Sequence, residues 1–139
     1  MIAFDTDILS ELLDGTPAYV QRASAIAIAD QYVPIVVATE VLRGRLNAIR
    51  QAEAQKGKLS LERAFALFEQ SLVGIANYQL LAYTAGADSL FKQWKAAKVR
   101  VGSRDLRIAA IAIAHGVKLV TRNARDFALV PGLNFEVWN

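Results

Sequence analysis

The sequence predicts an α/β fold in which a mostly parallel sheet of about five strands lies between two layers of helices. Short apolar runs typical of buried strands alternate with longer segments in which apolar residues recur at helical spacing. Helices that separate successive strands favour parallel pairing through right-handed crossovers. A length of 139 residues fits one domain, residues 1–139.

The first quarter of the chain contains one predicted strand and two helices. Ile2–Phe4 is a short apolar run, and Ile8–Leu13 resembles a short helix that ends at Asp14-Gly15. Thr16-Pro17 then supplies a capping hydroxyl and a proline at the first helical position. The second helix is expected to carry Tyr19 to about Ala29.

The middle of the chain contains a strand followed by two long helices. Val33–Val37 is a compact β-branched run that reads as a second buried strand. Thr39 is expected to cap a helix that begins at Glu40 and reaches Gln55, before Gly57. Ser60 begins the next helix, whose apolar side chains recur at helical spacing: Leu61, Ala64, Phe65, Phe68 and Leu72.

The last part of the chain alternates strands and helices again. Tyr78–Leu81 is the third expected strand, and Thr84–Ala97 is an amphipathic helix. Asp105–Ala114 is almost wholly apolar, which is typical of a buried helix, and Gly116 is suited to a left-handed cap after it. Two further strands complete the sheet: Lys118–Thr121 and Phe135–Trp138.

Composition excludes several kinds of chemistry. The chain has no cysteine, which excludes disulfides, zinc-thiolate sites and a thiol nucleophile, and favours a reducing compartment, the cytoplasm. Its single histidine, His115, excludes a paired-imidazole ribonuclease and is placed where a helix C-terminus favours positive charge. No apolar stretch approaches the roughly 18 residues needed to span a bilayer, and the acidic start is unlike a signal peptide.

Acidic residues follow the predicted strands. Asp5 ends the first strand, Glu40 lies just beyond the second, and Asp105 opens the buried helix. Asn123 and Asp126 follow the fourth strand. Each acid alone is explained equally well as a helix cap or by a favourable helix dipole. Together they are expected at one edge of the sheet, where ligands bind in α/β proteins.

Neighbouring carboxylates repel one another unless a cation lies between them, and oxygen ligands suit Mg²⁺ or Mn²⁺. A hydrolase with these residues would therefore use metal-activated water. The net charge of +3 is compatible with a polyanionic partner. Among the clustered basic residues, Arg43 and Arg104 lie nearest to the acids in sequence. They are the first candidates for phosphate contact, although either can instead form a salt bridge across the acidic pocket, and a solvated basic face is the simpler explanation.

Four runs resemble the PIN-domain nucleases, and most closely the VapC toxins of bacterial toxin-antitoxin pairs. The runs are FDTDILSELL, ATEVLRGR, VGSRDLRIAAIAIAHG, and LVTRNARDF with the following VPGLNFEVW. They stand in the family's order and span essentially the whole chain. The resemblance implies a compact α/β/α sandwich, usually a homodimer, that hydrolyses RNA such as tRNA or rRNA with Mg²⁺ or Mn²⁺ and leaves 5′ phosphate and 3′ hydroxyl ends.

The resemblance also implies roles for individual residues. The family's first three acids fall on Asp5, Glu40 and Asp105. Many relatives have an acid at the position of Asn123, and Asp126 matches another frequently acidic position, so either can supply the fourth ligand. Thr6 and Thr121 would be supporting hydroxyls, and Asp7 would orient a ligand or stabilise the helix start. An antitoxin tail is expected in a groove, and the apolar helices after Pro17 and Ser60 are the candidates to form it, although packing within the domain or at a dimer interface explains them equally well.

Two other functions remain compatible with the sequence. Asp5 and Asp7 also resemble the nucleophile and general acid of a haloacid-dehalogenase-type phosphatase, a family that does not predict Glu40 or Asp105. A catalytically degenerate RNA-binding module is the third possibility, because Asn123 replaces an acid.

Overall fold

The computed structural model describes residues 1–139, and at its centre is a five-stranded sheet in the order β3-β2-β1-β4-β5. All four strand pairings are parallel. The predicted α/β fold is therefore confirmed, with a sheet that is wholly parallel. The strands are β1 (Ile2–Phe4), β2 (Gln31–Pro34), β3 (Gln79–Leu81), β4 (Lys118–Thr121) and β5 (Phe135–Val137).

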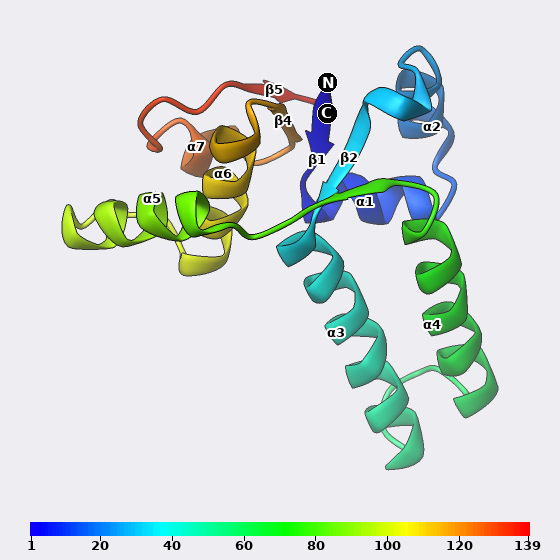
Figure 1. Ribbon diagram of the computed structural model, residues 1–139. Coiled ribbons are helices and arrows are strands. Elements are labelled where there is room, and N and C mark those ends of the chain that lie inside the picture. The colour runs from blue at the N-terminus through cyan, green and yellow to red at the C-terminus, as the bar shows by residue number, and fades with distance from the viewer.

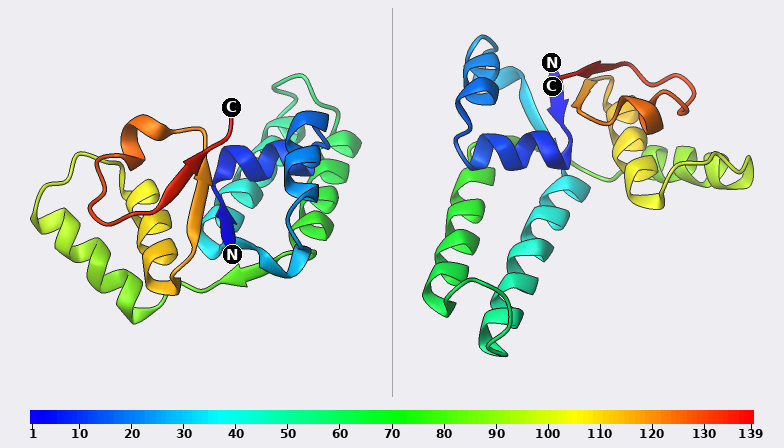
Figure 2. Two further views of the ribbon diagram at one scale, coloured as in Figure 1. Left: turned by 90° about the horizontal axis from the view of Figure 1, so that it is seen from above. Right: turned by 180° about the vertical axis from the view of Figure 1, so that it is seen from behind.

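Helices cover both faces of this sheet (Figure 1). The helices of the first half of the chain lie on one side, and those of the second half lie on the other, as the two views of Figure 2 also show. In the first half these are α1 (Thr6–Leu13), α2 (Pro17–Ser24), α3 (Ile35–Glu53) and α4 (Leu61–Ile75). In the second half these are α5 (Ala85–Ala96), α6 (Ser103–His115) and α7 (Ala124–Phe127). The long helices α3 and α4 pack against each other as a pair that extends away from the sheet.

The helix α6 is buried because its side chains are small or aliphatic. Six of its residues are fully buried: Leu106, Ile108, Ala109, Ala110, Ile111 and Ala112. Alanines on this helix allow its backbone to approach the sheet closely, where it contacts β4 and β2. Gly116 caps it in the predicted left-handed conformation, with φ of 68°. The first turn of α6, which carries Asp105, is thereby held rigidly.

The prediction of a strand over Val33–Val37 is wrong at its C-terminal end. The strand β2 ends at Pro34, and α3 begins at Ile35. Thr39 lies inside this helix instead of capping it, since its hydroxyl donates to the carbonyls of Ile35 and Val36. Val33 and Val37 are both fully buried, and this is why the run resembled one continuous strand. Glu40 consequently projects from the second turn of α3.

The prediction of one helix from Tyr19 to about Ala29 is also wrong, because α2 ends at Ser24 and a short 3₁₀ turn follows at Ile28–Asp30. Two carbonyls at this end accept hydrogen bonds from the buried Gln31 side-chain amide, those of Ala23 and Ile26. Thr16 occupies the expected N-cap position, but its side chain makes no capping hydrogen bond. The Gln31 side chain, from the first residue of β2, thus holds the segment that leads from α2 into this strand.

Other local predictions are confirmed. Ser60 begins α4, which it caps by accepting from the Arg63 amide, and the helix expected over Thr84–Ala97 is α5. Thr84 caps α5 by accepting from the Ala87 amide, a role that was not predicted. The short helix α7 was not predicted. His115, at the end of α6, lies 2.9 Å from the Ala82 carbonyl oxygen through its Nε2 atom and has no place among the acids. No helix has both the length and the apolar character that a membrane crossing requires.

Replacing Gln31 with methionine is expected to lower the free energy of unfolding by about 1–3 kcal/mol, because two carbonyls lose their partner in a buried setting. Urea denaturation measures this change. The matched control is Gln79→Met, since the exposed Gln79 amide donates a single hydrogen bond to the Ala29 carbonyl. Equal losses in both variants would contradict the role assigned to Gln31.

Candidate active site

The candidate site lies where the sheet changes its direction of winding. The strands β1 and β4 are neighbours in the sheet but are connected to strands on opposite sides, so their carboxyl ends open into a crevice between the two helical layers. Asp5 follows β1 and its amide donates to the Val120 carbonyl at 2.9 Å. Thr121 is the last residue of β4. Parallel pairing therefore places Asp5 and Thr121 together, 116 positions apart in sequence.

Asp5 is a buried carboxylate, and each of its two oxygens accepts a hydrogen bond from the protein. Its residue is 6% exposed, its Oδ1 accepts from the Thr6 amide, and its Oδ2 accepts from the Thr121 hydroxyl. The first of these bonds caps α1. Burial raises the pKa of Asp5, and the two hydrogen bonds oppose that increase. Asp5 is thus both a helix cap and a rigidly oriented oxygen donor.

Glu40 reaches the same crevice from α3. Its Oε2 accepts from the Thr6 hydroxyl at 2.9 Å, so Thr6 connects both acids, through its amide to Asp5 and through its hydroxyl to Glu40. The side chain is only 11% exposed, and burial raises the pKa of Glu40. Arg104 Nε lies 2.8 Å from Oε1, yet no N–H is aimed at this buried oxygen, which accepts no hydrogen bond. The contact is an ion pair without directional bonding.

Asp105 is an acid whose pKa is changed by both burial and neighbouring acids. It lies half-buried in the first turn of α6, and its carboxylate makes neither a hydrogen bond nor an ion pair. The pKa of Asp105 is raised from 3.8 to about 6, chiefly by burial and then by the charges of Asp5, Glu40 and Asp126, in that order. Asp5, Glu40 and Asp126 are therefore near enough to Asp105 to act on its charge, and Thr6 connects Asp5 with Glu40 through hydrogen bonds.

The turn after β4 places Asp126 beside this group. Asn123 caps α7: its Oδ1 accepts from the Asp126 amide at 3.3 Å, and its Nδ2 donates to Asp126 Oδ2 at 3.0 Å. Its own amide donates to the Thr121 hydroxyl at 2.9 Å. The two alternatives for a fourth ligand are thus different in kind. The oxygen of Asn123 is already used inside the turn, whereas Asp126 acts on Asp105 electrostatically.

Asp7 lies farther out on α1 than its neighbour Asp5. Its side chain is 63% exposed and lies 4.0 Å from the guanidinium of Arg122. Arg122 also approaches Glu11 at 3.8 Å and the Tyr19 hydroxyl at 3.4 Å, so it connects β4 to α1 and α2. Sequence reasoning did not single out Arg122, and its only local signal was its position directly after the fourth strand.

A polar cleft of about 390 Å³ adjoins the acids on the side of α3. We call it the arginine cleft, and no hydrophobic residue lines it. Both candidates for phosphate contact, Arg43 and Arg104, belong to it. Sequence reasoning placed Arg50 only within the general basic cluster and missed Asn47 entirely. The lining residues are Glu40, Arg43, Gly44, Asn47, Arg50 and Arg104.

The acids fit a hydrated hard cation. No three carboxylates lie close enough to enclose a bare ion, but Mg²⁺ keeps several waters and needs only one or two direct carboxylates. The donor set consists of oxygen alone. The carboxylate of Asp105 has no ion-pair partner, and the buried Oε1 of Glu40 accepts no hydrogen bond although Arg104 lies 2.8 Å from it. These features match the chemistry expected of a magnesium or manganese site.

Comparisons with known proteins agree with this fold. The model of the PIN domain family matches residues 2–133. Ribonuclease VapC1 of Rickettsia felis is 31% identical over 132 residues, covering 95% of this chain and 92% of that protein.

Solved structures are similar over nearly the full length. A DNA-bound VapBC from Salmonella typhimurium has a chain 25% identical, with a TM-score of 0.76 over 99% of this chain and 98% of that chain. VapBC2 of Rickettsia felis, bound to a promoter DNA fragment, has a chain with a TM-score of 0.77 at 19% identity, with complete coverage of both chains. The family match, the curated relative and the acidic crevice lead to one conclusion: the chain belongs to the PIN-domain family.

Proposed function

We propose that this protein is a divalent-metal-dependent endoribonuclease and the toxin of a VapBC-type pair in the cytoplasm. The observation that carries the proposal is the group of four carboxylates, Asp5, Glu40, Asp105 and Asp126, in one crevice at the carboxyl edge of the sheet. The similarity to a protein named Ribonuclease VapC1 supports RNA as the substrate class. A structured RNA, tRNA or rRNA, is the proposed target.

The four carboxylates would hold a hydrated Mg²⁺ or Mn²⁺, one or two of them directly and the others through its bound waters, with Asp5, Glu40 and Asp105 as the main ligands and Asp126 as the fourth. Asn123 is a positioning residue in this scheme, because both ends of its amide hold Asp126. When bound, such an ion lowers the pKa of a coordinated water and stabilises charge on the departing 3′ oxygen.

The chain's own residues prepare this chemistry. Thr121 and Thr6 fix the orientations of Asp5 and Glu40, so that their oxygens are presented without rotational freedom. Arg104 compensates the charge of Glu40 and, together with Arg43, offers guanidinium groups to a substrate phosphate beside the acids. The surrounding apolar core limits the access of water to Asp5 from below the sheet edge.

The phosphatase alternative finds no support in this arrangement. A general acid two residues after the nucleophile would have to face the same substrate, but Asp7 is 63% exposed and faces Arg122. Glu40 and Asp105, which that alternative does not explain, lie beside Asp5 instead. The binding-module alternative loses its main feature as well, since Asn123 holds an acid in place rather than leaving the site without one.

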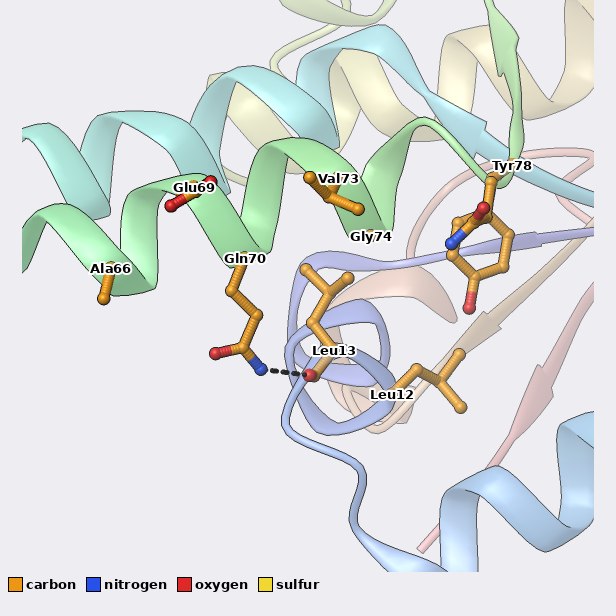
Figure 3. Close-up of a pocket in the computed structure, with 9 residues that line it drawn as sticks. Leu12, Leu13, Ala66, Glu69, Gln70, Val73, Gly74 and Tyr78 are labelled. Carbon is orange, nitrogen blue, oxygen red and sulfur yellow. Dashed lines mark hydrogen bonds between the residues drawn. The ribbon is translucent and has the colours of Figure 1, made fainter.

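We propose that an antitoxin partner binds in a groove between α1 and α4. A cavity of about 500 Å³ lies between α1 and α4, lined by Leu12, Leu13 and Val73 among others (Figure 3). Gln70 Nε2 donates to the Leu13 carbonyl at 3.2 Å and closes one side. No residue of α2 lines this cavity, so of the two helices expected to form the groove only α4 does so. The proteins of similar structure are VapBC complexes, and a homodimer stays a prediction.

Asp5→Asn is expected to abolish cleavage of a cellular RNA pool in Mg²⁺ or Mn²⁺, by at least about 100-fold. Asparagine caps helices as well as aspartate does, so the variant should retain the fold while one anionic ligand is lost. Gel analysis of cut RNA, with chelator as a second arm, measures the effect. The control is Asp30→Asn, at an exposed carboxylate in the 3₁₀ turn that precedes β2, at the end of that strand away from the acids. Metal-independent cutting, or full activity of Asp5→Asn, would refute the proposal.

Affinity for Mg²⁺ is expected to rise steeply as pH increases through about 6, because Asp105 must lose its proton to bind a cation. The metal-free protein should show the opposite trend in stability. The pKa of Asp105 in the folded protein is raised above 3.8, so the folded state binds more protons than the unfolded state. The free energy of unfolding therefore falls as pH rises from 3.8 to about 6.

Calorimetric Mg²⁺ titration and urea denaturation at about pH 5, 6 and 7 measure these two trends. The control is Asp105→Asn, in which both pH dependences should be much reduced. Affinity that is constant over this range in the native protein would contradict the assignment of Asp105 as a ligand.

A further inference from the structure

The arginine cleft follows a single stripe of α3. Its residues Glu40, Arg43, Asn47 and Arg50 are separated by three or four positions, the spacing that aligns side chains along one face of a helix. Arg104, from the first turn of α6, closes the end nearest the acids. The cleft therefore begins at the carboxylates and continues along α3 away from the sheet, along the helix pair seen in Figure 1.

The arginines of this stripe are free to bind a ligand. Arg43 and Arg50 are exposed, and neither forms an ion pair or a side-chain hydrogen bond. By contrast, Arg45 on the adjacent face of the same helix donates to Ser71 and pairs with Asp14, which fastens α3 to α4 and α1. The helix thus has one arginine committed to packing and two that are uncommitted on the side of the cleft.

The chemistry of the lining selects an extended polyanion. Three guanidinium groups face one carboxylate, and no apolar or aromatic side chain is present to bury a base or an aliphatic ligand. Arg43 and Arg50 are seven residues apart, about 10 Å along the helix axis. Long side chains at that spacing suit successive phosphates of one strand, whereas a compact anion would engage only one end of the cleft.

Arg50 also has a purely structural explanation. It lies in the last turn of α3, where positive charge is favoured by the helix dipole. That explanation accounts for Arg50 alone. It does not account for its alignment with Arg43 and Arg104 in one cleft without hydrophobic lining.

We propose that the arginine cleft binds the sugar-phosphate backbone of single-stranded RNA beyond the cleavage point, with Arg50 as a phosphate contact remote from the acids. This inference rests on the proposed ribonuclease function and specifies how the substrate strand leaves the site. Because the cleft offers no aromatic surface for stacking, it binds RNA on this side without regard to base identity. Sequence preference is determined elsewhere on the protein.

The test is fluorescence anisotropy of the full chain with labelled single-stranded RNA in chelator, so that binding is measured without cleavage. Arg50→Gln is expected to weaken binding about three- to tenfold, and to reduce the slope of log K against log salt by about 0.7, the value for one lost phosphate contact in a single strand. Arg50→Lys should retain most of the slope because it retains the charge. Arg63→Gln, at an exposed arginine outside the cleft, is the matched control.

Oligomers of two to ten nucleotides, in oligo(U) and oligo(A) series, provide the second readout. The native protein should gain affinity with length until Arg50 is reached, and Arg50→Gln should lose this later gain equally in both series. The unfolding temperature of Arg50→Gln is measured as well. An unfolding temperature equal to that of the native protein would show that weaker binding does not result from a destabilised end of α3.

The outcomes separate the two proposals. Native protein that cuts RNA while Arg50→Gln binds as well as Arg63→Gln would overturn the cleft assignment alone. A loss confined to one base series would overturn backbone binding. Native protein that neither binds nor cuts RNA would overturn the ribonuclease function together with this inference.

Discussion

The burial of one carboxylate, that of Asp5, is the constraint on which the rest of the site depends. Parallel pairing of β1 with β4 brings Asp5 and Thr121 together at the point where the sheet changes its direction of winding. A buried carboxylate is unfavourable unless donors reach it, and here the Thr6 amide and the Thr121 hydroxyl do so. The start of α1, the end of β4 and the turn into α7 are all connected through these bonds.

The acids that surround Asp5 are kept in mutual repulsion by the fold. Rigid elements hold them: α3 carries Glu40, the first turn of the buried helix α6 carries Asp105, and α7 carries Asp126. Burial of Asp105 and, after it, the charges of these neighbouring acids raise its pKa. Arg104 relieves the repulsion only partly, because it lies beside Glu40 without donating a directed hydrogen bond. A cation bound among these acids would reduce the repulsion between their carboxylates.

Positive charge is arranged next to this negative centre rather than within it. On α3, Glu40 belongs to the acids, and Arg43 and Arg50 continue the same stripe outward. A phosphodiester strand requires both regions, because its backbone is anionic and a cation is needed where it meets carboxylates. The long pair of helices α3 and α4 is thus a support that extends the site beyond the sheet. The groove between α1 and α4 shares no lining residue with the arginine cleft, so the proposed protein partner and the proposed RNA strand would contact different residues.

What the sequence by itself determined was local. Ser60 begins a helix and Gly116 caps one as predicted, because a cap depends on residues within a few positions of it. The placement of Asp5, Glu40 and Asp105 at one sheet edge also followed from the alternation of strands and helices. The boundary between β2 and α3 did not, because Val33 and Val37 are buried alike and only the pairing of Pro34 with Leu81 ends the strand there. Tertiary structure alone decided the strand order, the holding of Asp126 by Asn123, and the alignment of Asn47 and Arg50 with Arg104. These depend on contacts between distant segments, for which a linear pattern of residues carries no signal.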